Sequence, residues 1–164
     1  MFKKIMFCFF VCFFSMNGYA DPGVHSRPVR VYADIVGDLF HMGHVEFFKN
    51  AKAYGDYLII GVLSDESVAS YKRIPILTLE ERVAVIKACK YVDEVIAAPP
   101  LRTTKEWLEE HQIDIVVHGD DFNKEQLLDQ YTAPIEMDIF KIVPYTRGIS
   151  STDIIKRIKE RVAK

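Results

Sequence analysis

The fold is decided by the stretch Val31-Tyr32-Ala33-Asp34-Ile35-Val36-Gly37-Asp38-Leu39-Phe40-His41-Met42-Gly43-His44, in which an apolar strand passes through a short turn into a helix. His41 and His44 are three residues apart, which places both imidazoles on one side of the first helical turn. Gly43 has no Cβ to crowd anything lying over that turn. The unpaired N–H groups of a helix start favour an anion, and neutral imidazoles add further donors. The pattern therefore predicts a phosphate-binding site.

A second phosphate motif, Gly148-Ile149-Ser150-Ser151-Thr152, opens a helix expected over Asp153–Val162. Its three successive hydroxyls can cap the helix, and they can also donate hydrogen bonds to phosphate oxygens. An ordinary helix cap would need only one of the three. Taken alone, the first motif has an equally plain alternative, a pair of helix-cap or surface histidines.

Composition limits the classes of function. The 164 residues suffice for one domain, and 49% apolar with 27% charged residues is ordinary for a globular protein. The formal net charge of −2 argues against a general nucleic-acid binder, because no broad basic surface is available to neutralise phosphates. A small anionic substrate would then be held by local cations, helix ends and metal.

The first residues have the pattern of a targeting segment. Two lysines precede the apolar run Ile5–Phe14, and small residues lead up to Ala20, which is typical of a secretory signal peptide over residues 1–20. The run is too short to span a bilayer stably. An uncleaved membrane-associated extension and a start codon assigned too early are the alternatives, so the compartment stays open between exported and cytoplasmic. We expect residues 21–28 to be a linker and 29–164 to be the catalytic domain.

Strand and helix patterns alternate from Val29 onward. The apolar runs predict strands at Val29–Tyr32, Tyr57–Leu63, Glu94–Ala97, Ile113–His118 and Ile139–Val143. Helices are expected over His41–Tyr54, Glu66–Tyr71, Thr78 to Lys90, Thr103 to His111 and Asp153–Val162. This rhythm predicts an α/β fold, a Rossmann-like doubly wound parallel sheet of about five strands with helices on both faces. Both phosphate motifs would then lie at the carboxyl edge of the sheet.

Capping boxes, Thr78 with Glu81 and Thr103 with Glu106, mark the starts of two of these helices. Cys89 falls in the apolar helical pattern Val83–Val92 and is the only cysteine of residues 29–164, so it cannot form an internal disulfide there. We expect it to be a buried core residue rather than a nucleophile.

The His-x-Gly-His motif after a strand resembles the nucleotidyltransferase superfamily. Further segments make the resemblance narrower, namely Gly61–Glu66, Ala88–Val95, Val117–Asp121 and Gly148–Thr152. In this order and spacing they are similar to the cytidylyltransferase family of phospholipid-precursor synthesis, and most similar to its ethanolamine-phosphate branch. The resemblance covers Val29 to about Ile158 and implies the His-x-Gly-His nucleotidyltransferase fold.

The resemblance implies transfer of CMP from CTP to a phosphorylated alcohol, with release of pyrophosphate. Phosphoethanolamine is the favoured acceptor, and phosphocholine or glycerol 3-phosphate are alternatives. Mg²⁺ is expected with CTP, and a homodimer is expected. An adenylyltransferase of the same fold and a nucleotide-binding homologue without catalysis are the competing interpretations.

The resemblance also assigns roles to residues of this chain. His41, His44 and Lys72 would act on the phosphates during transfer, with Asp38 and Gly43 beside them. Asp120 would lie near the base and ribose, and Gly148, Ile149, Ser150, Ser151 and Thr152 would hold the outer phosphates. Weaker candidates for lining or bracing the site are Asp65, Arg82, Asp93, Thr146 and Arg147.

The chain departs from the family pattern at two places. Ile35 and Gly37 stand where the family usually has glycine and phenylalanine, so the turn is expected to be rebuilt. Tyr145 replaces an arginine that grips phosphate in the family. Arg147, two residues on, is a hypothetical substitute for the missing charge.

Overall fold

The computed structural model describes residues 27–121, 124–144 and 146–163. The expected signal peptide, residues 21–26 of the expected linker and Tyr145 lie outside the described residues. Within the described ranges, no helix combines the length and the apolar character needed to cross a membrane.

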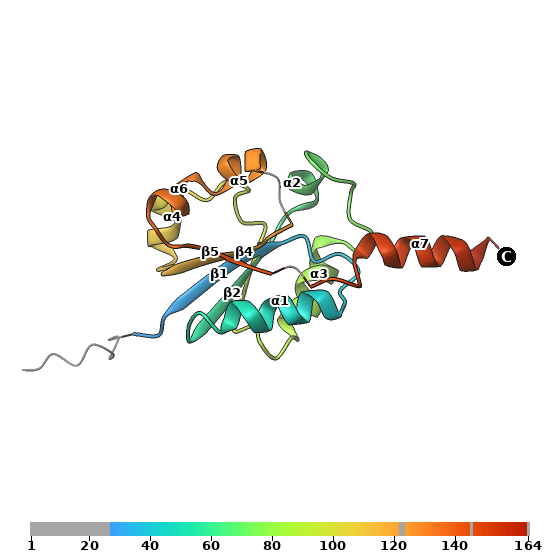
Figure 1. Cartoon of the computed structure of the whole chain (residues 1–164), viewed down its shortest axis with the longest axis horizontal. Helices are drawn as coiled ribbons and strands as arrows, with labels where there is room; N and C mark the ends of the chain where they lie inside the picture. Colours follow the sequence, from blue (N-terminus) through green and yellow to red (C-terminus); the bar gives the residue numbers. More distant parts are fainter. Residues whose placement is uncertain (1–26, 122–123, 145, 164) are drawn as a thin grey trace, which may run out of the picture.

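Five parallel strands form one sheet, which confirms the predicted parallel α/β fold (Figure 1). Their order in the sheet is β3-β2-β1-β4-β5. The strands are β1 (Arg30–Ile35), β2 (Tyr57–Val62), β3 (Glu94–Ala97), β4 (Ile115–Gly119) and β5 (Phe140–Val143). The chain moves outward from β1 to β3 and then returns to place β4 on the other side of β1. The direction of winding therefore reverses between β1 and β4, where ligands bind in sheets of this kind.

Helices cover both faces of the sheet. They are α1 (Met42–Lys52), α2 (Asp65–Ala69), α3 (Leu79–Lys87), α4 (Lys105–Glu110), α5 (Lys124–Gln130), α6 (Thr132–Glu136) and α7 (Ser151–Val162). In Figure 1, α1 and α3 lie below the sheet and α4, α5 and α6 lie above it. α7 has no buried residue and extends away from the body of the molecule. The sequence patterns predicted no element for α5 and α6.

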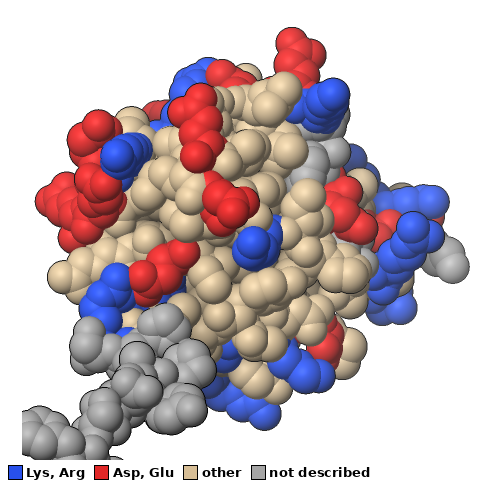
Figure 2. Space-filling model, turned by 60° about the vertical axis from the view of Figure 1, so that its left-hand side comes forward, with Lys and Arg blue, Asp and Glu red and all other residues tan. Residues whose placement is uncertain are grey.

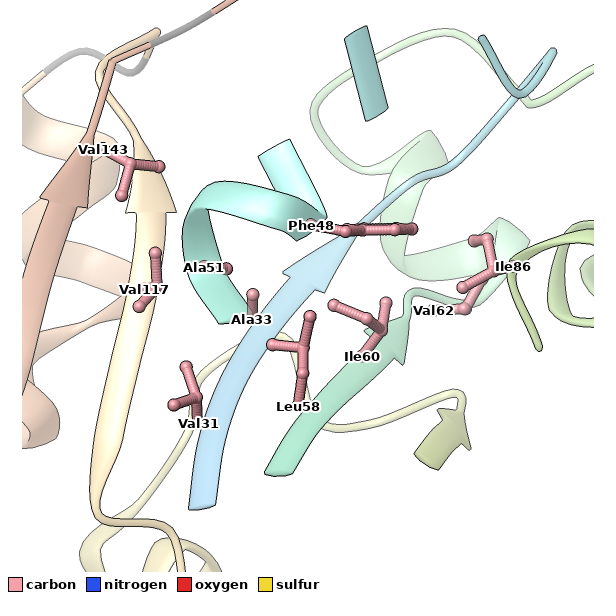
Figure 3. Packing of buried hydrophobic residues seen from close by; sticks show 10 residues of the cluster. All are labelled: Val31, Ala33, Phe48, Ala51, Leu58, Ile60, Val62, Ile86, Val117 and Val143. Carbon is pink, nitrogen blue, oxygen red and sulfur yellow. The ribbon is translucent and has the colours of Figure 1, made fainter. Parts of the chain in front are cut away.

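The core follows the two-residue period of the strands. On one face, Val31 and Ala33 of β1 and Leu58, Ile60 and Val62 of β2 pack against Phe48 and Ala51 of α1 and Ile86 of α3 (Figure 3). On the other face, Tyr32, Ile59 and Val116 pack with Leu108 of α4 and with Tyr131. Both faces of the central strands are therefore buried, which explains their nearly continuous apolar sequence.

The predicted helix boundaries differ from the observed ones by a few residues, and two of these differences change the role of a named residue. α4 is capped by Thr104, whose Oγ1 accepts a hydrogen bond from the Trp107 N–H at 3.3 Å, whereas Thr103 is buried. α3 ends at Lys87 rather than Lys90, so Cys89 follows the helix and packs half-buried against the core. The capping box of Thr78 and Glu81 is confirmed, with both reciprocal bonds present.

Acidic and basic side chains are interspersed over the face shown in Figure 2. Uncharged surface separates many of them, and several basic side chains gather at the right-hand edge of this view. This distribution agrees with the nearly balanced count of 21 basic and 23 acidic side chains.

Phe48 is completely buried between α1 and the sheet, so truncation there tests the packing of the core. Phe48→Ala should lower the free energy of unfolding by about 3–5 kcal/mol, because it removes buried surface and leaves a cavity. Urea denaturation measures this change. Tyr54→Ala, at a ring that is 39% exposed just after the same helix, is the control and should change stability by less than about 1 kcal/mol. Equal losses in the two variants would contradict this packing.

Candidate active site

A cavity of about 520 Å³ opens at the carboxyl ends of β1 and β4. His41 and His44 line it from the start of α1, and Ser150, Ser151 and Thr152 line it from the start of α7. The two phosphate motifs, far apart in the chain, therefore face one cavity. It sits at the point where the winding of the sheet reverses.

The two histidines cap the helix that carries them. The Gly43 N–H donates to Nδ1 of His41 at 3.1 Å, and the His41 N–H donates to Nδ1 of His44 at 3.3 Å. The rings stack with their centroids 3.9 Å apart. Because each Nδ1 accepts a hydrogen bond, the proton of each neutral ring sits on Nε2. Each ring thus keeps one N–H donor for a ligand.

Gly43 makes this arrangement sterically feasible. A Cβ at this position would lie 2.9 Å from Cε1 of His41 and 3.5 Å from Cγ2 of Ile149. A side chain here would therefore displace the first imidazole. Ile149 approaches the same point from the second motif, which brings the two motifs into contact range.

Both histidines are neutral at pH 7. Burial lowers the pKa of His44 to about 3, with a further lowering from the neighbouring His41. Burial also lowers the pKa of His41, although the nearby Asp153 carboxylate opposes the shift. The imidazoles can therefore donate hydrogen bonds to phosphate but do not bring a permanent positive charge.

Asp38 connects three segments around the cavity. Its Oδ1 accepts hydrogen bonds from the N–H groups of Ile76 and Leu77, each at 3.1 Å, and its Oδ2 pairs with Arg73 at 2.9 Å. Its backbone oxygen accepts from Oγ of Ser151 at 2.6 Å. Burial raises the pKa of Asp38, but these hydrogen bonds and the Arg73 charge outweigh it and hold the pKa below its usual value. Asp38 lines the cavity, yet its carboxylate is engaged by the loop.

The hydroxyls of the second motif have distinct roles. Ser150 caps α7 by accepting the Asp153 N–H at 3.1 Å, and its own hydroxyl donates to Oδ2 of Asp153 at 2.6 Å. Ser151 binds Asp38 and is the first residue of α7, which begins there rather than at Asp153. Thr152 lines the cavity beside them, as does Thr146.

The turn after β1 is rebuilt in the way that the displaced glycine suggested. Gly37 has a φ of +69°, a left-handed conformation that glycine adopts without strain. A Cβ here would also come within 2.5 Å of Cδ1 of Ile86. Ile35 is the last residue of β1, so the flexible position lies two residues later than in the family pattern.

Arg82 and Asp65 brace the site from behind. Arg82 is completely buried and donates to the backbone oxygens of Val36 at 2.6 Å and Leu63 at 2.9 Å. It also pairs with Asp65, while Ser64 rather than Asp65 caps α2. The guanidinium therefore ties together the chain segments that leave β1 and β2, and neither residue lines the cavity.

Several predicted site residues lie elsewhere. Asp93 does not line the cavity, since its carboxylate accepts the Leu58 N–H at 2.6 Å and pairs with Lys52 at the amino end of β2. Asp120 is exposed, and Asp121 lines the cavity in its place. Arg147 is exposed and does not line the cavity, and Gly148 and Ile149 likewise lie outside the lining.

A buried polar group at the cavity wall escaped the sequence patterns. The hydroxyl of Tyr131 donates to Oδ1 of Asp34 at 2.7 Å, and both residues are buried. Burial and the Asp34 charge raise the pKa of Tyr131 well above its usual value and that of Tyr71 to about 12. His118, at the end of β4, also lines this region, and its ring lies 5.1 Å from that of Tyr131. Asp34 stood in the quoted stretch, after the predicted strand Val29–Tyr32, although β1 extends to Ile35. Tyr131 lies in a segment for which no helix or strand was predicted.

Lys72 and Arg73 bring positive charge to the cavity from the loop before α3. Lys72 was expected there, whereas Arg73 was not. In the sequence, only the position of Arg73 next to Lys72 could have indicated that Arg73 belongs to the site.

The described residues contain no group of three or more His, Cys, Asp or Glu side chains placed to hold a metal ion. The cavity carboxylates other than Asp38 are Asp34 and Asp121. This donor set suits a magnesium ion that arrives on phosphate oxygens and keeps most of its waters, rather than a caged metal.

Protonation of His44 should make stability depend on pH. Its pKa of about 3 in the folded chain lies below the ordinary 6.5, so the unfolded chain binds more protons between these values. The free energy of unfolding should therefore fall as the pH is lowered through this window, measured by urea denaturation at about pH 7 and about pH 5. His44→Gln should reduce that dependence, with His111→Gln as the control for loss of an imidazole. An unchanged dependence in His44→Gln would refute the assignment.

Known proteins share both the sequence pattern and the fold. Residues 38–157 match the family described as Cytidylyltransferase-like. The chain is 44% identical over 133 residues to an ethanolamine-phosphate cytidylyltransferase of Dictyostelium discoideum, which covers 78% of this chain and 37% of that protein. It is 42% identical over 135 residues to choline-phosphate cytidylyltransferase A of Rattus norvegicus, which covers 80% of this chain and 37% of that protein.

A solved structure, that of the lipopolysaccharide core biosynthesis protein from Thermoplasma volcanium GSS1, matches with a TM-score of 0.59 at 28% identity. The match covers 75% of this chain and 100% of that one. The chain spans just over a third of the length of the two curated relatives. Because the match to the family covers residues 38–157, the chain belongs to the cytidylyltransferase-like family.

Proposed function

We propose that this chain transfers CMP from CTP to phosphoethanolamine and releases pyrophosphate. The observation that carries the proposal is one cavity lined both by the two phosphate motifs and by an acidic, aromatic group, namely Asp34, Tyr71 and Tyr131. The family membership and the named activities of the curated relatives support the reaction class.

At the phosphate end, the Nε2–H groups of His41 and His44 and the cation of Lys72 face the same space as the start of α7. An oxygen of phosphoethanolamine attacks the α-phosphorus of CTP, and the bond from that phosphorus to the bridging oxygen of the β-phosphate breaks. The electron pair leaves with pyrophosphate. Such a reaction needs positioning and stabilisation of charge more than covalent help, and neutral donors with nearby cations supply both.

Asp34 offers this cavity a buried carboxylate that accepts the Tyr131 hydroxyl, and Tyr71 lines the cavity within the electrostatic range of Asp34. Phosphoethanolamine carries a primary ammonium, which donates hydrogen bonds to a carboxylate and is attracted to aromatic faces. A quaternary ammonium lacks the N–H donors, so this arrangement favours ethanolamine over choline. Glycerol 3-phosphate has no positive charge to match Asp34.

Magnesium enters in this proposal as the complex of CTP, with its phosphate oxygens as the main ligands. The homodimer stays a prediction from the family resemblance.

The direct test is pyrophosphate release by the purified chain with CTP, Mg²⁺ and each of phosphoethanolamine, phosphocholine and glycerol 3-phosphate. The proposal expects turnover with CTP and the highest kcat/KM for phosphoethanolamine. A parallel thermal-shift series compares CTP with ATP. Stabilisation by ATP alone would identify an adenylyltransferase, and CTP binding without turnover on any acceptor would identify a non-catalytic nucleotide-binding protein.

Replacement of Asp34 tests the ammonium end separately. Asp34→Asn should raise the KM for phosphoethanolamine about 10–100-fold, since a charged hydrogen bond contributes about 1.5–3 kcal/mol. The KM for CTP should stay near the wild-type value, because the proposal gives this carboxylate the ammonium of the acceptor and not the triphosphate. Steady-state kinetics with each substrate varied in turn measures both constants.

Asp129→Asn is a matched control, because Asp129 pairs with Arg102 on the surface and does not line the cavity. A rise in both KM values for Asp34→Asn would contradict a specific role at the acceptor end.

A further inference from the structure

We infer that Arg73 binds the phosphate chain of the nucleotide and that its ion pair with Asp38 positions it for this contact. The inference rests on the proposed function for the identity of the ligand, a nucleoside triphosphate. In the family pattern, an arginine at the position of Tyr145 supplies positive charge to the phosphates. We assign this role to Arg73 in the loop between α2 and α3.

The cavity needs more positive charge than its histidines supply. His41 and His44 are neutral at pH 7, since burial lowers the pKa of each. Among the described residues that line the cavity, Lys72 and Arg73 carry the permanent positive charges. A triphosphate keeps negative charge even with a magnesium ion bound, so both cations lie where that charge has to be met.

The guanidinium of Arg73 is held in place by two hydrogen bonds and keeps further N–H donors. One donor reaches Oδ2 of Asp38 at 2.9 Å, and another reaches the backbone oxygen of Ile74 at 3.2 Å. The remaining N–H groups of the planar fork are available, and this fork matches phosphate oxygens well. The Arg73 side chain is 45% exposed, whereas that of Asp38 is 3% exposed. The Asp38 carboxylate is therefore buried, whereas the Arg73 guanidinium remains accessible to a ligand.

Asp38 also fixes where the guanidinium stands. The same carboxylate binds the N–H groups of Ile76 and Leu77, so the loop that carries Arg73 is held at Arg73 itself and near its carboxyl end. Through its backbone oxygen, Asp38 contacts Ser151 at the start of α7. Arg73 thus lies on a loop tied directly to the second phosphate motif. Arg147, the substitute expected from the sequence, is exposed outside the cavity.

Binding of CTP and CMP to the full chain tests the inference without requiring turnover. In calorimetry with Mg²⁺, Arg73→Ala should raise the Kd of CTP about 10–100-fold, the loss expected for a charged hydrogen bond. The Kd of CMP, which lacks the outer phosphates, should change less than about threefold. Arg73→Lys should recover part of the CTP affinity, because it keeps the charge and loses the fork.

Arg27→Ala is the matched control. Arg27 has the same side-chain exposure, 45%, and pairs with Asp114 at 2.7 Å near the amino end of the sheet. Its removal should leave both dissociation constants unchanged. Thermal denaturation of each variant, recorded beside the calorimetry, reports any loss of fold.

Wild-type CTP affinity in Arg73→Ala would overturn the inference, as would an equal loss of CTP and CMP affinity, which denotes a purely structural role. The proposed function fails in a different way. Arg73-dependent CTP binding without pyrophosphate release on any acceptor would refute the transfer reaction and uphold the inference. A wild-type chain that binds no CTP would overturn both.

Discussion

The site depends on a single buried carboxylate, that of Asp38. It satisfies the N–H groups of Ile76 and Leu77 and the guanidinium of Arg73, while its own peptide oxygen receives the Ser151 hydroxyl. Three segments that are distant in the chain are thereby joined: the turn after β1, the loop before α3 and the first turn of α7. Without this carboxylate, the two N–H groups of the loop would lose their protein acceptor and Arg73 would lose its ion partner.

The cavity separates hydrogen bonding from charge. Half-buried, neutral imidazoles donate from rings whose orientation is fixed by the capping of α1, whereas Lys72 and Arg73 supply positive charge from an exposed loop. Each ring is oriented by a backbone N–H that donates to its Nδ1, and the two rings stack on each other. Precise donors and permanent charge thus come from different elements, each suited to its task.

The sheet and the pairing of the two phosphate motifs could be predicted from the sequence, because apolar strands and helix-start signatures leave a period and a spacing. The predictions of individual site residues that did not hold depend on how the chain folds in space. Asp93 matched a family segment, but linear similarity does not reveal that it lies at the amino end of the sheet. The choice between Asp120 and Asp121 depends on how the chain turns after β4, which no side-chain pattern encodes. Tyr131 and Arg73 lack periodic neighbours, so only their positions in the fold reveal them.

α7 has no buried residue, and its first turn is fastened to the domain through the Ser151 hydroxyl. A helix is stiff along its axis, so its twelve residues behave as a rod attached at one end. Because α7 is one continuous helix, the direction of its exposed turns is set by that first turn, where Ser151 and Thr152 border the cavity.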